Sequence, residues 1–141
     1  MINIRKYLDL FFKISNFTII ILYLYPGSIL GWILYGNLKS QPQLTGDFLS
    51  LSSNHLYTFL ILSFIAVLNY SNNSKKLNYI FLYLLFISII LEISHLVIPN
   101  RSFQFEDLIG NITGVIISYI LMKILNSITT FPHFKKELSI H

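Results

Sequence analysis

The segment LNYIFLYLLFISIILEISHLVI, residues 77–98, decides the fold class of this chain. Its single charge is Glu92, and it is long enough to cross a hydrocarbon core, which takes about 20 apolar residues in a helix. Three further apolar stretches accompany it, and we expect them to span the membrane at about 14–35, 54–70 and 105–125. The sequence therefore predicts an all-α membrane protein built as a four-transmembrane-helix bundle.

The composition agrees with this fold class and excludes others. Of the 141 residues, 54% are hydrophobic and 11% are charged, whereas a soluble domain carries about a quarter charged residues. Four spans with short loops use nearly the whole length, so we expect one transmembrane domain over residues 1–141. The net charge of +4 does not indicate nucleic-acid binding, because the positive residues cluster at the ends of the apolar segments, where topology and lipid phosphates explain them.

The first span contains a break. Pro26 and Gly27 interrupt it, and residues 28–35 include Trp32 and Tyr35, which favour the membrane–water boundary. We expect residues 28–35 either to continue the span or to form a short interfacial helix. A cleaved signal peptide is not expected, because no small-x-small cleavage pattern follows and three more spans do.

The positive residues also predict the orientation. With four crossings, eight of the ten Lys and Arg residues fall on one side, and Lys39 and Arg101 fall on the other. Because positive residues are retained in the cytoplasm, we expect both termini there and a multi-pass protein of the cell membrane.

This orientation gathers polar residues from distant parts of the chain into one layer. The start of the second span, the end of the third and the start of the fourth all lie at the outer face, and they supply the candidate binding pocket: His55, Glu92, His95, Arg101, Asp107 and Asn111. An unpaired carboxylate is costly inside a membrane, so Glu92 must be paired, hydrated or protonated, and Arg101 is the nearest candidate cation.

Several of these residues have a simpler structural explanation than a role in a binding pocket. Asp107 falls in the first turn of its helix, where the helix dipole favours an acid, and Asn111 has the option of interhelical hydrogen bonding. His55, Glu92 and His95 raise the question of a metal, but one Glu-x-x-His pair is a weak pattern, so we expect no metal and no cofactor. Small residues of the fourth span predict a helix-packing surface: Gly110, Gly114 and Ser118.

The stretch LEISHLVIPNRSF, residues 91–103, with Asp107, Asn111 and Gly114 after it, resembles the VanZ-like family of small bacterial membrane proteins. The family pattern is a glutamate late in the third helix, then Pro-x-Arg, then Asp, Asn and Gly spaced down the fourth helix. A histidine early in the second helix completes it and corresponds to His55.

Two positions depart from that pattern. His95 stands where the family often has Gln, and a position that accepts Gln is a poor metal ligand, so this departure also argues against a metal. Leu51 and Ser52 stand where Asp and Lys often precede the histidine, which weakens any charge-dependent role for that loop.

The resemblance implies a bacterial inner-membrane protein, in a family named for a protein linked to low-level teicoplanin resistance. The residues favour a non-enzymatic protein whose outward-facing polar pocket binds an envelope lipid or amphiphile, with Arg101 pairing a headgroup phosphate. One alternative is an accessory structural subunit of a larger membrane complex. Another is an enzyme acting on a lipid-linked substrate, with Glu92 or Asp107 as acid or base and His55 as proton partner, which requires His55 within about 8 Å of a carboxylate.

Overall fold

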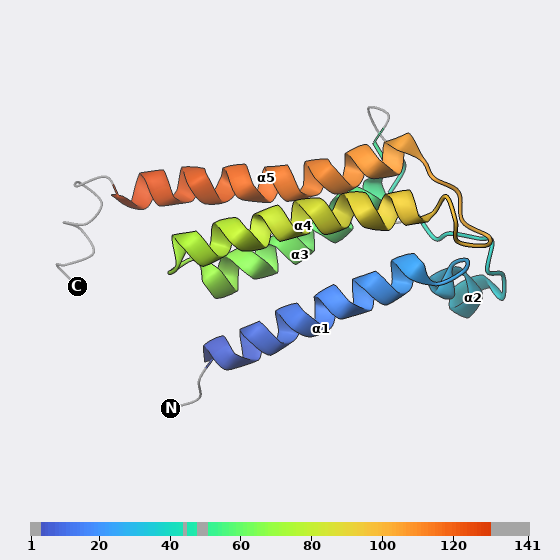
Figure 1. Cartoon of the computed structure of the whole chain (residues 1–141), viewed down its shortest axis with the longest axis horizontal. Helices are drawn as coiled ribbons and strands as arrows, with labels where there is room; N and C mark the ends of the chain where they lie inside the picture. The colour runs from blue at the N-terminus through green and yellow to red at the C-terminus, as the bar shows by residue number, and fades with distance from the viewer. Residues whose placement is uncertain (1–3, 44, 48–50, 131–141) are drawn as a thin grey trace.

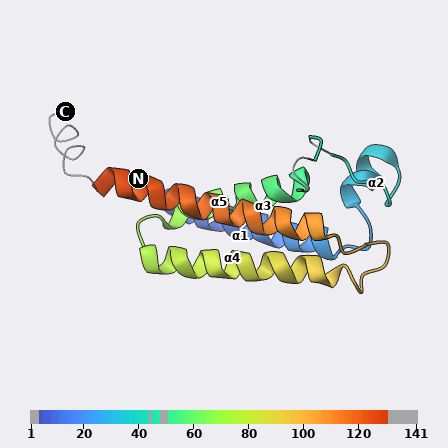
Figure 2. The same ribbon diagram turned by 90° about the horizontal axis from the view of Figure 1, so that it is seen from above.

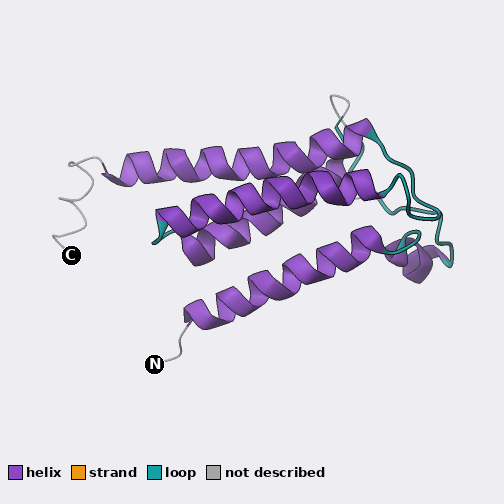
Figure 3. Ribbon diagram, in the orientation of Figure 1, coloured by secondary structure: helices purple, strands orange, loops and turns teal. Residues whose placement is uncertain are grey.

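The computed structural model describes residues 4–43, 45–47 and 51–130, and these ranges hold five α-helices. They are α1 (Ile4–Leu24), α2 (Ile29–Tyr35), α3 (Ser53–Tyr70), α4 (Ser74–Ser94) and α5 (Phe105–Thr130). The long helices run along one another, and the short α2 lies at one end of the bundle (Figures 1 and 2). Loops join the helices at the two ends of the bundle (Figure 3). Within the described ranges, three helical segments are long and apolar enough to cross a membrane, namely Ile4–Leu24, Ser74–Ser94 and Phe105–Leu125.

The first expected span is divided in two. Helix α1 ends at Leu24, so the expectation that it continues to Tyr35 is wrong. The chain turns at Gly27, whose φ of 100° is in the left-handed region that glycine tolerates. Ser28 then caps a separate helix α2, because its hydroxyl oxygen accepts a hydrogen bond from the Gly31 backbone N–H at 2.9 Å. Residues 28–35 thus form the short helix that the sequence offered as an alternative.

The third span also ends earlier than expected. Helix α4 stops at Ser94 rather than at Ile98, because residues next to Pro99 are disfavoured in the helical conformation and the chain tightens into turns after Glu92. The shorter helix leaves a loop of residues 95–104 between α4 and α5 at the same end of the bundle as α2 (Figure 1). This loop carries His95 and Arg101 to the candidate pocket.

Helices α3 and α5 make the most extensive contact in the bundle. A Cβ on Gly110 would lie 2.8 Å from the Ser52 carbonyl oxygen, and one on Gly114 would overlap the Leu56 carbonyl oxygen. One turn further, the Ser118 hydroxyl donates to the Leu60 carbonyl oxygen at 3.0 Å. The small residues of α5 therefore let the two backbones approach closely, as they do in many membrane helix pairs.

The surface of the bundle is apolar as well as its core. The core is filled by Phe59, Leu62, Leu77, Leu84 and Leu91, each at most 2% exposed. Large apolar side chains on the outside are more than half exposed: Phe11, Phe17, Tyr79, Leu82 and Phe86. Such a surface suits contact with lipid rather than with water.

Candidate functional site

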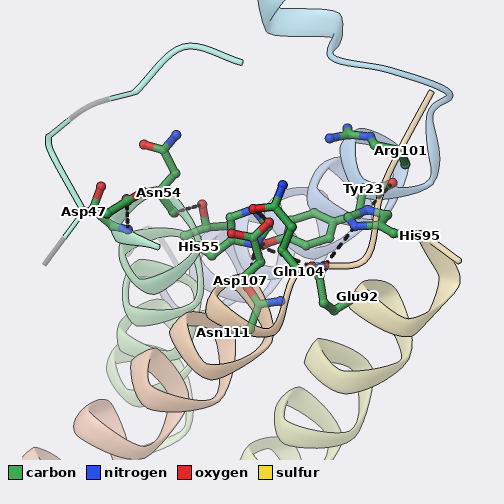
Figure 4. A network of polar contacts seen from close by, with 12 residues as sticks. Tyr23, Asp47, Asn54, His55, Glu92, His95, Arg101, Gln104, Asp107 and Asn111 are labelled. Atoms are coloured by element: carbon green, nitrogen blue, oxygen red, sulfur yellow. Dashed lines mark hydrogen bonds and ion pairs between the residues drawn. The ribbon is translucent and has the colours of Figure 1, made fainter. Parts of the chain in front are cut away.

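Polar side chains from four helices meet inside the bundle at the end that carries α2 (Figure 4). Helix α1 contributes Tyr23, α3 contributes His55, α4 contributes Glu92, and α5 contributes Asp107 and Asn111. All five are buried, with Glu92 and Asn111 both 0% exposed. These helix ends converge because the long helices alternate in direction. The sequence predicted the same arrangement, with polar residues from distant parts of the chain in one layer.

His55 occupies the centre of this polar cluster. Its Nε2 atom lies 3.3 Å from Asp107 Oδ2, and its Nδ1 atom lies 3.7 Å from Glu92 Oε2. The Nδ1 atom also lies 3.0 Å from the Tyr23 hydroxyl oxygen and 3.2 Å from Asn111 Oδ1. One imidazole therefore links residues from α1, α4 and α5.

Asn111 fixes which nitrogen of His55 carries a proton. Its amide group donates to the Ser88 carbonyl oxygen at 3.4 Å, so its Oδ1 atom is directed at Tyr23 and His55. The Tyr23 hydroxyl donates to Oδ1 at 2.8 Å. Because a side-chain amide oxygen only accepts hydrogen bonds, the Nδ1 atom of His55 must be a donor. This assignment from the hydrogen-bond network leaves Nε2 facing Asp107.

Only one of the two Glu92 oxygens has hydrogen-bond partners among the described residues. Oε1 lies 3.2 Å from His95 Nδ1 and accepts from the Gln104 backbone N–H at 3.2 Å. Oε2 is buried and has no hydrogen-bond partner among the described residues. The Nε2 atom of His95 donates to the Tyr23 carbonyl oxygen at 3.1 Å, so His95 bridges α4 and α1.

Arg101 does not pair with Glu92 as the sequence led us to expect. Its Nη2 and Nε atoms donate to the carbonyl oxygens of Leu22, at 2.8 Å, and Tyr25, at 3.3 Å. The last carbonyls of a helix lack partners within it and carry the negative end of the dipole, so Arg101 caps α1 from another part of the chain. Burial lowers the pKa of Arg101 from its ordinary value, but a guanidinium remains charged near neutral pH.

Two adjoining cavities lie beside the polar cluster. The larger, of about 290 Å³, is mostly apolar and is bordered by α1, α2 and α3, with His55, His95 and Arg101 among its lining residues. The smaller, of about 130 Å³, is mostly polar, and its lining includes Lys39, Arg101, Gln104 and Asp107. Ser28, Gln41, His95 and Arg101 line both cavities. An apolar chamber and a cationic chamber are therefore neighbours, with Arg101 at their boundary.

The structure brings five of the six sequence-predicted residues into one cluster, while Arg101 lies beside it at the cavity boundary. Tyr23 is the participant that sequence reasoning missed. Its signal is that a polar aromatic residue stands just before the Pro26 break, in the same outer layer as the other candidates. The backbone N–H of Gln104 and the backbone carbonyl of Ser88 carry no sequence signal at all.

A comparison with known protein families finds a match that includes all of these residues. The family described as VanZ/LLP1 matches residues 17–126, a range that includes all six predicted residues and Tyr23. A search of curated proteins and a search of solved structures each found no match. The family match covers most of the chain and agrees with the resemblance carried by residues 91–103, so this protein belongs to the VanZ/LLP1 family.

Proposed function

We propose that this protein is a multi-pass protein of the bacterial inner membrane that binds an anionic envelope lipid or amphiphile at its extracytoplasmic end. The observation that carries this proposal is the pair of adjoining cavities, one apolar and one cationic, which share Arg101. An amphiphile presents the same two chemistries in the same order, an acyl chain next to a charged headgroup.

The proposed topology has four crossings and both termini in the cytoplasm. Helix α3 has 18 residues and is about 27 Å long at 1.5 Å per residue, which is near the thickness of a hydrocarbon core. Its polar ends lower its hydropathy, whereas its outward-facing residues Ile61, Phe64 and Leu68 are apolar and about half exposed, as a lipid-facing surface requires. Arg5, Lys6, Lys75, Lys76 and Lys123 then lie towards the cytoplasm, as the positive-inside rule expects. Lys135 and Lys136, which support the same orientation, lie outside the described residues.

The cavity sizes define the ligand that would fit. A volume of about 290 Å³ is at the lower limit of ligand pockets, which are roughly 300–1,000 Å³, so it suits a single acyl chain rather than a whole lipid. The smaller cavity offers Lys39 and Arg101 to a headgroup phosphate. Asp107 also lines it, and a proton held between its Oδ2 atom and His55 Nε2, 3.3 Å away, would reduce the repulsion between this carboxylate and a phosphate. An acylated glycopeptide such as teicoplanin belongs to the same class of amphiphile.

Binding of a phosphate-bearing lipid to the purified protein tests the proposal. Phosphatidic acid and the matching diacylglycerol, which lacks the phosphate, are titrated onto the protein in a neutral detergent, and bound lipid is measured by native mass spectrometry. We expect preference for phosphatidic acid, and at least about tenfold weaker binding in Arg101→Gln, because a hydrogen bond to a charged group contributes about 1.5–3 kcal/mol. Lys39→Gln, whose side chain is exposed, should cost less, about threefold.

Lys75→Gln is the matched control, because Lys75 lies at the opposite end of the bundle. Because Arg101 also caps α1, Arg101→Gln affects folding as well as binding. Lys39→Gln is therefore the variant that reports on binding alone. Equal affinity for the two lipids, or unchanged binding in both Arg101→Gln and Lys39→Gln, would contradict the proposal.

Catalysis on a lipid-linked substrate is a second candidate. One observation favours it: His55 Nε2 is 3.3 Å from Asp107 Oδ2, well inside the distance that acid–base chemistry requires. This candidate predicts release of inorganic phosphate or another headgroup product during incubation with the lipid, and loss of that release in Asp107→Asn. If the lipid binds and is recovered intact, catalysis is excluded and only the binding function remains. The remaining alternative, an accessory subunit, predicts a partner protein that copurifies in a near-equal amount.

A further inference from the structure

We propose that His55, Glu92 and Asp107 form a binding site for a divalent first-row transition metal ion. This inference goes beyond amphiphile binding and does not depend on it. The three residues come from three different helices, α3, α4 and α5, and each offers a ligand atom within 4.8 Å of the other two.

The distances are close to those of a metal site. Zinc binds His nitrogen and carboxylate oxygen at about 2.0–2.2 Å, so two ligands of a tetrahedral ion are roughly 3.4 Å apart. The 3.3 Å between His55 Nε2 and Asp107 Oδ2 agrees with this spacing. Ligands of one ion cannot be more than about 4.2 Å apart, twice the bond length, so a pair at the 4.8 Å limit would have to approach by about 0.6 Å when the ion binds.

The protonation of His55 suits a ligand. Its Nδ1–H donates to Asn111 Oδ1, which fixes the ring and the tautomer, and the Nε2 atom is left to face a carboxylate oxygen. Metal-binding histidines have this arrangement, with one nitrogen on the metal and the other donating to an oxygen. A cation, either a metal ion or a proton, is needed between Nε2 and Asp107 because both atoms otherwise present lone pairs to each other.

Glu92 supplies an independent indication of a missing cation. Its side chain is 0% exposed, and its Oε2 atom has no hydrogen-bond partner in the described part of the chain. Oε1 is already occupied by His95 and the Gln104 N–H, which hold the carboxylate in place. An anionic oxygen left without a donor at this depth costs several kcal/mol, and a divalent ion beside it would remove that cost.

His95 lies behind Glu92 and is not among the three ligands. The expectation that no metal binds rests on a site containing His95 and on the weakness of one Glu-x-x-His pair. The arrangement in the structure is different, because Asp107 takes the third position and His95 supports Glu92 from the side. One nitrogen and two carboxylate oxygens suit Zn²⁺, Mn²⁺ or Co²⁺, and three protein ligands leave a coordination position open.

The test measures metal binding directly, without any assay of activity. The full-length protein in detergent is stripped with a chelator, exchanged into chelator-free buffer and titrated with Zn²⁺, Mn²⁺ or Co²⁺ by calorimetry, and the bound metal is counted by mass spectrometry after desalting. We expect one ion per chain for at least one metal. Asp107→Asn and Glu92→Gln should bind it at least tenfold more weakly, whereas Glu106→Gln, an exposed neighbour of Asp107, should bind as the wild type does.

Cobalt adds a measurement that does not need the variants to fold. Co²⁺ bound to the wild-type protein through a histidine nitrogen should give visible absorption bands that zinc removes by competition. The proposal is overturned if the wild-type protein binds no ion at up to about 100 μM of each metal. It is also overturned if folded Asp107→Asn and Glu92→Gln bind as tightly as Glu106→Gln. In either case protons alone neutralise the cluster.

Discussion

Replacing Asn111 by alanine should destabilise the bundle more than replacing an exposed asparagine by alanine does. Asn111 is 0% exposed and accepts hydrogen bonds from the Tyr23 hydroxyl at 2.8 Å and from His55 Nδ1 at 3.2 Å. It also makes a longer donation, of 3.4 Å, to the Ser88 carbonyl oxygen. A single side chain of α5 thereby connects α1, α3 and α4, and its loss removes all three connections at once.

The magnitude follows from which groups lose their partner. Hydrogen bonds within membrane bundles average about 0.6 kcal/mol and reach about 1.7 kcal/mol, and an orphaned buried donor costs about 1–3 kcal/mol. The His55 Nδ1–H keeps the Tyr23 oxygen as an acceptor at 3.0 Å, so the Tyr23 hydroxyl proton is the main orphan. We therefore expect Asn111→Ala to lower the free energy of unfolding by about 2–4 kcal/mol. Tyr23→Phe removes the orphan itself and should cost only about 1 kcal/mol.

Unfolding of the detergent-solubilised protein with increasing SDS, followed by far-ultraviolet circular dichroism, measures these changes. Asn78→Ala is the matched control, because Asn78 is an exposed residue of α4, and it should change stability by no more than about 0.5 kcal/mol. If Asn111→Ala costs no more than Asn78→Ala, then the hydrogen bonds that join the four helices do not contribute to the stability of the bundle.

Three further predictions concern the packing and the position of the helices. Gly114→Ala should lower the free energy of unfolding by about 1–3 kcal/mol, because its new Cβ would overlap the α3 backbone. Gly46→Ala is the control and should be neutral, because open space surrounds Gly46. Equal effects of the two changes would mean that α3 and α5 are not in close contact. Ser63→Ala should be neutral or stabilising in the same unfolding assay, because the buried Ser63 hydroxyl has no partner among the described residues, and a loss above about 1 kcal/mol would show that it has one. Trp32 is the only tryptophan, so its fluorescence in vesicles should be quenched most by lipids brominated near the headgroup; strongest quenching from the chain ends would place α2 deep in the membrane.

The fold class and the family were predictable because they depend on patterns spread over many residues. Long apolar runs define the helices, and the spacing of Glu92, Arg101, Asp107 and Asn111 carries the family resemblance, which the family match confirms. The gathering of polar residues followed from topology alone, because alternating helices place every second end in one layer. The number of crossings and the orientation stay predictions.

The partners of the polar residues were not predictable in the same way. Arg101 was expected to pair with Glu92, but it caps the carbonyl oxygens at the end of α1, and those backbone atoms are exposed as acceptors only because the helix stops at Leu24. Glu92 is instead held by His95 and by a backbone N–H of the loop before α5. Such contacts depend on where helices end, and helix ends are set by local turn geometry more than by hydropathy.

Photocrosslinking of a bound lipid tests the amphiphile proposal most directly. A phosphatidic acid with a diazirine in its acyl chain is bound to the protein in detergent and illuminated, and the modified residues are mapped by mass spectrometry. We predict adducts on the half-buried residues that line the larger cavity, such as Ile19, Leu22, Ile29 and Thr58, and loss of these adducts when unlabelled phosphatidic acid competes. Adducts spread over the exposed apolar surface, on residues such as Phe17, Leu82 and Phe86, with none in the cavity, would contradict the proposal.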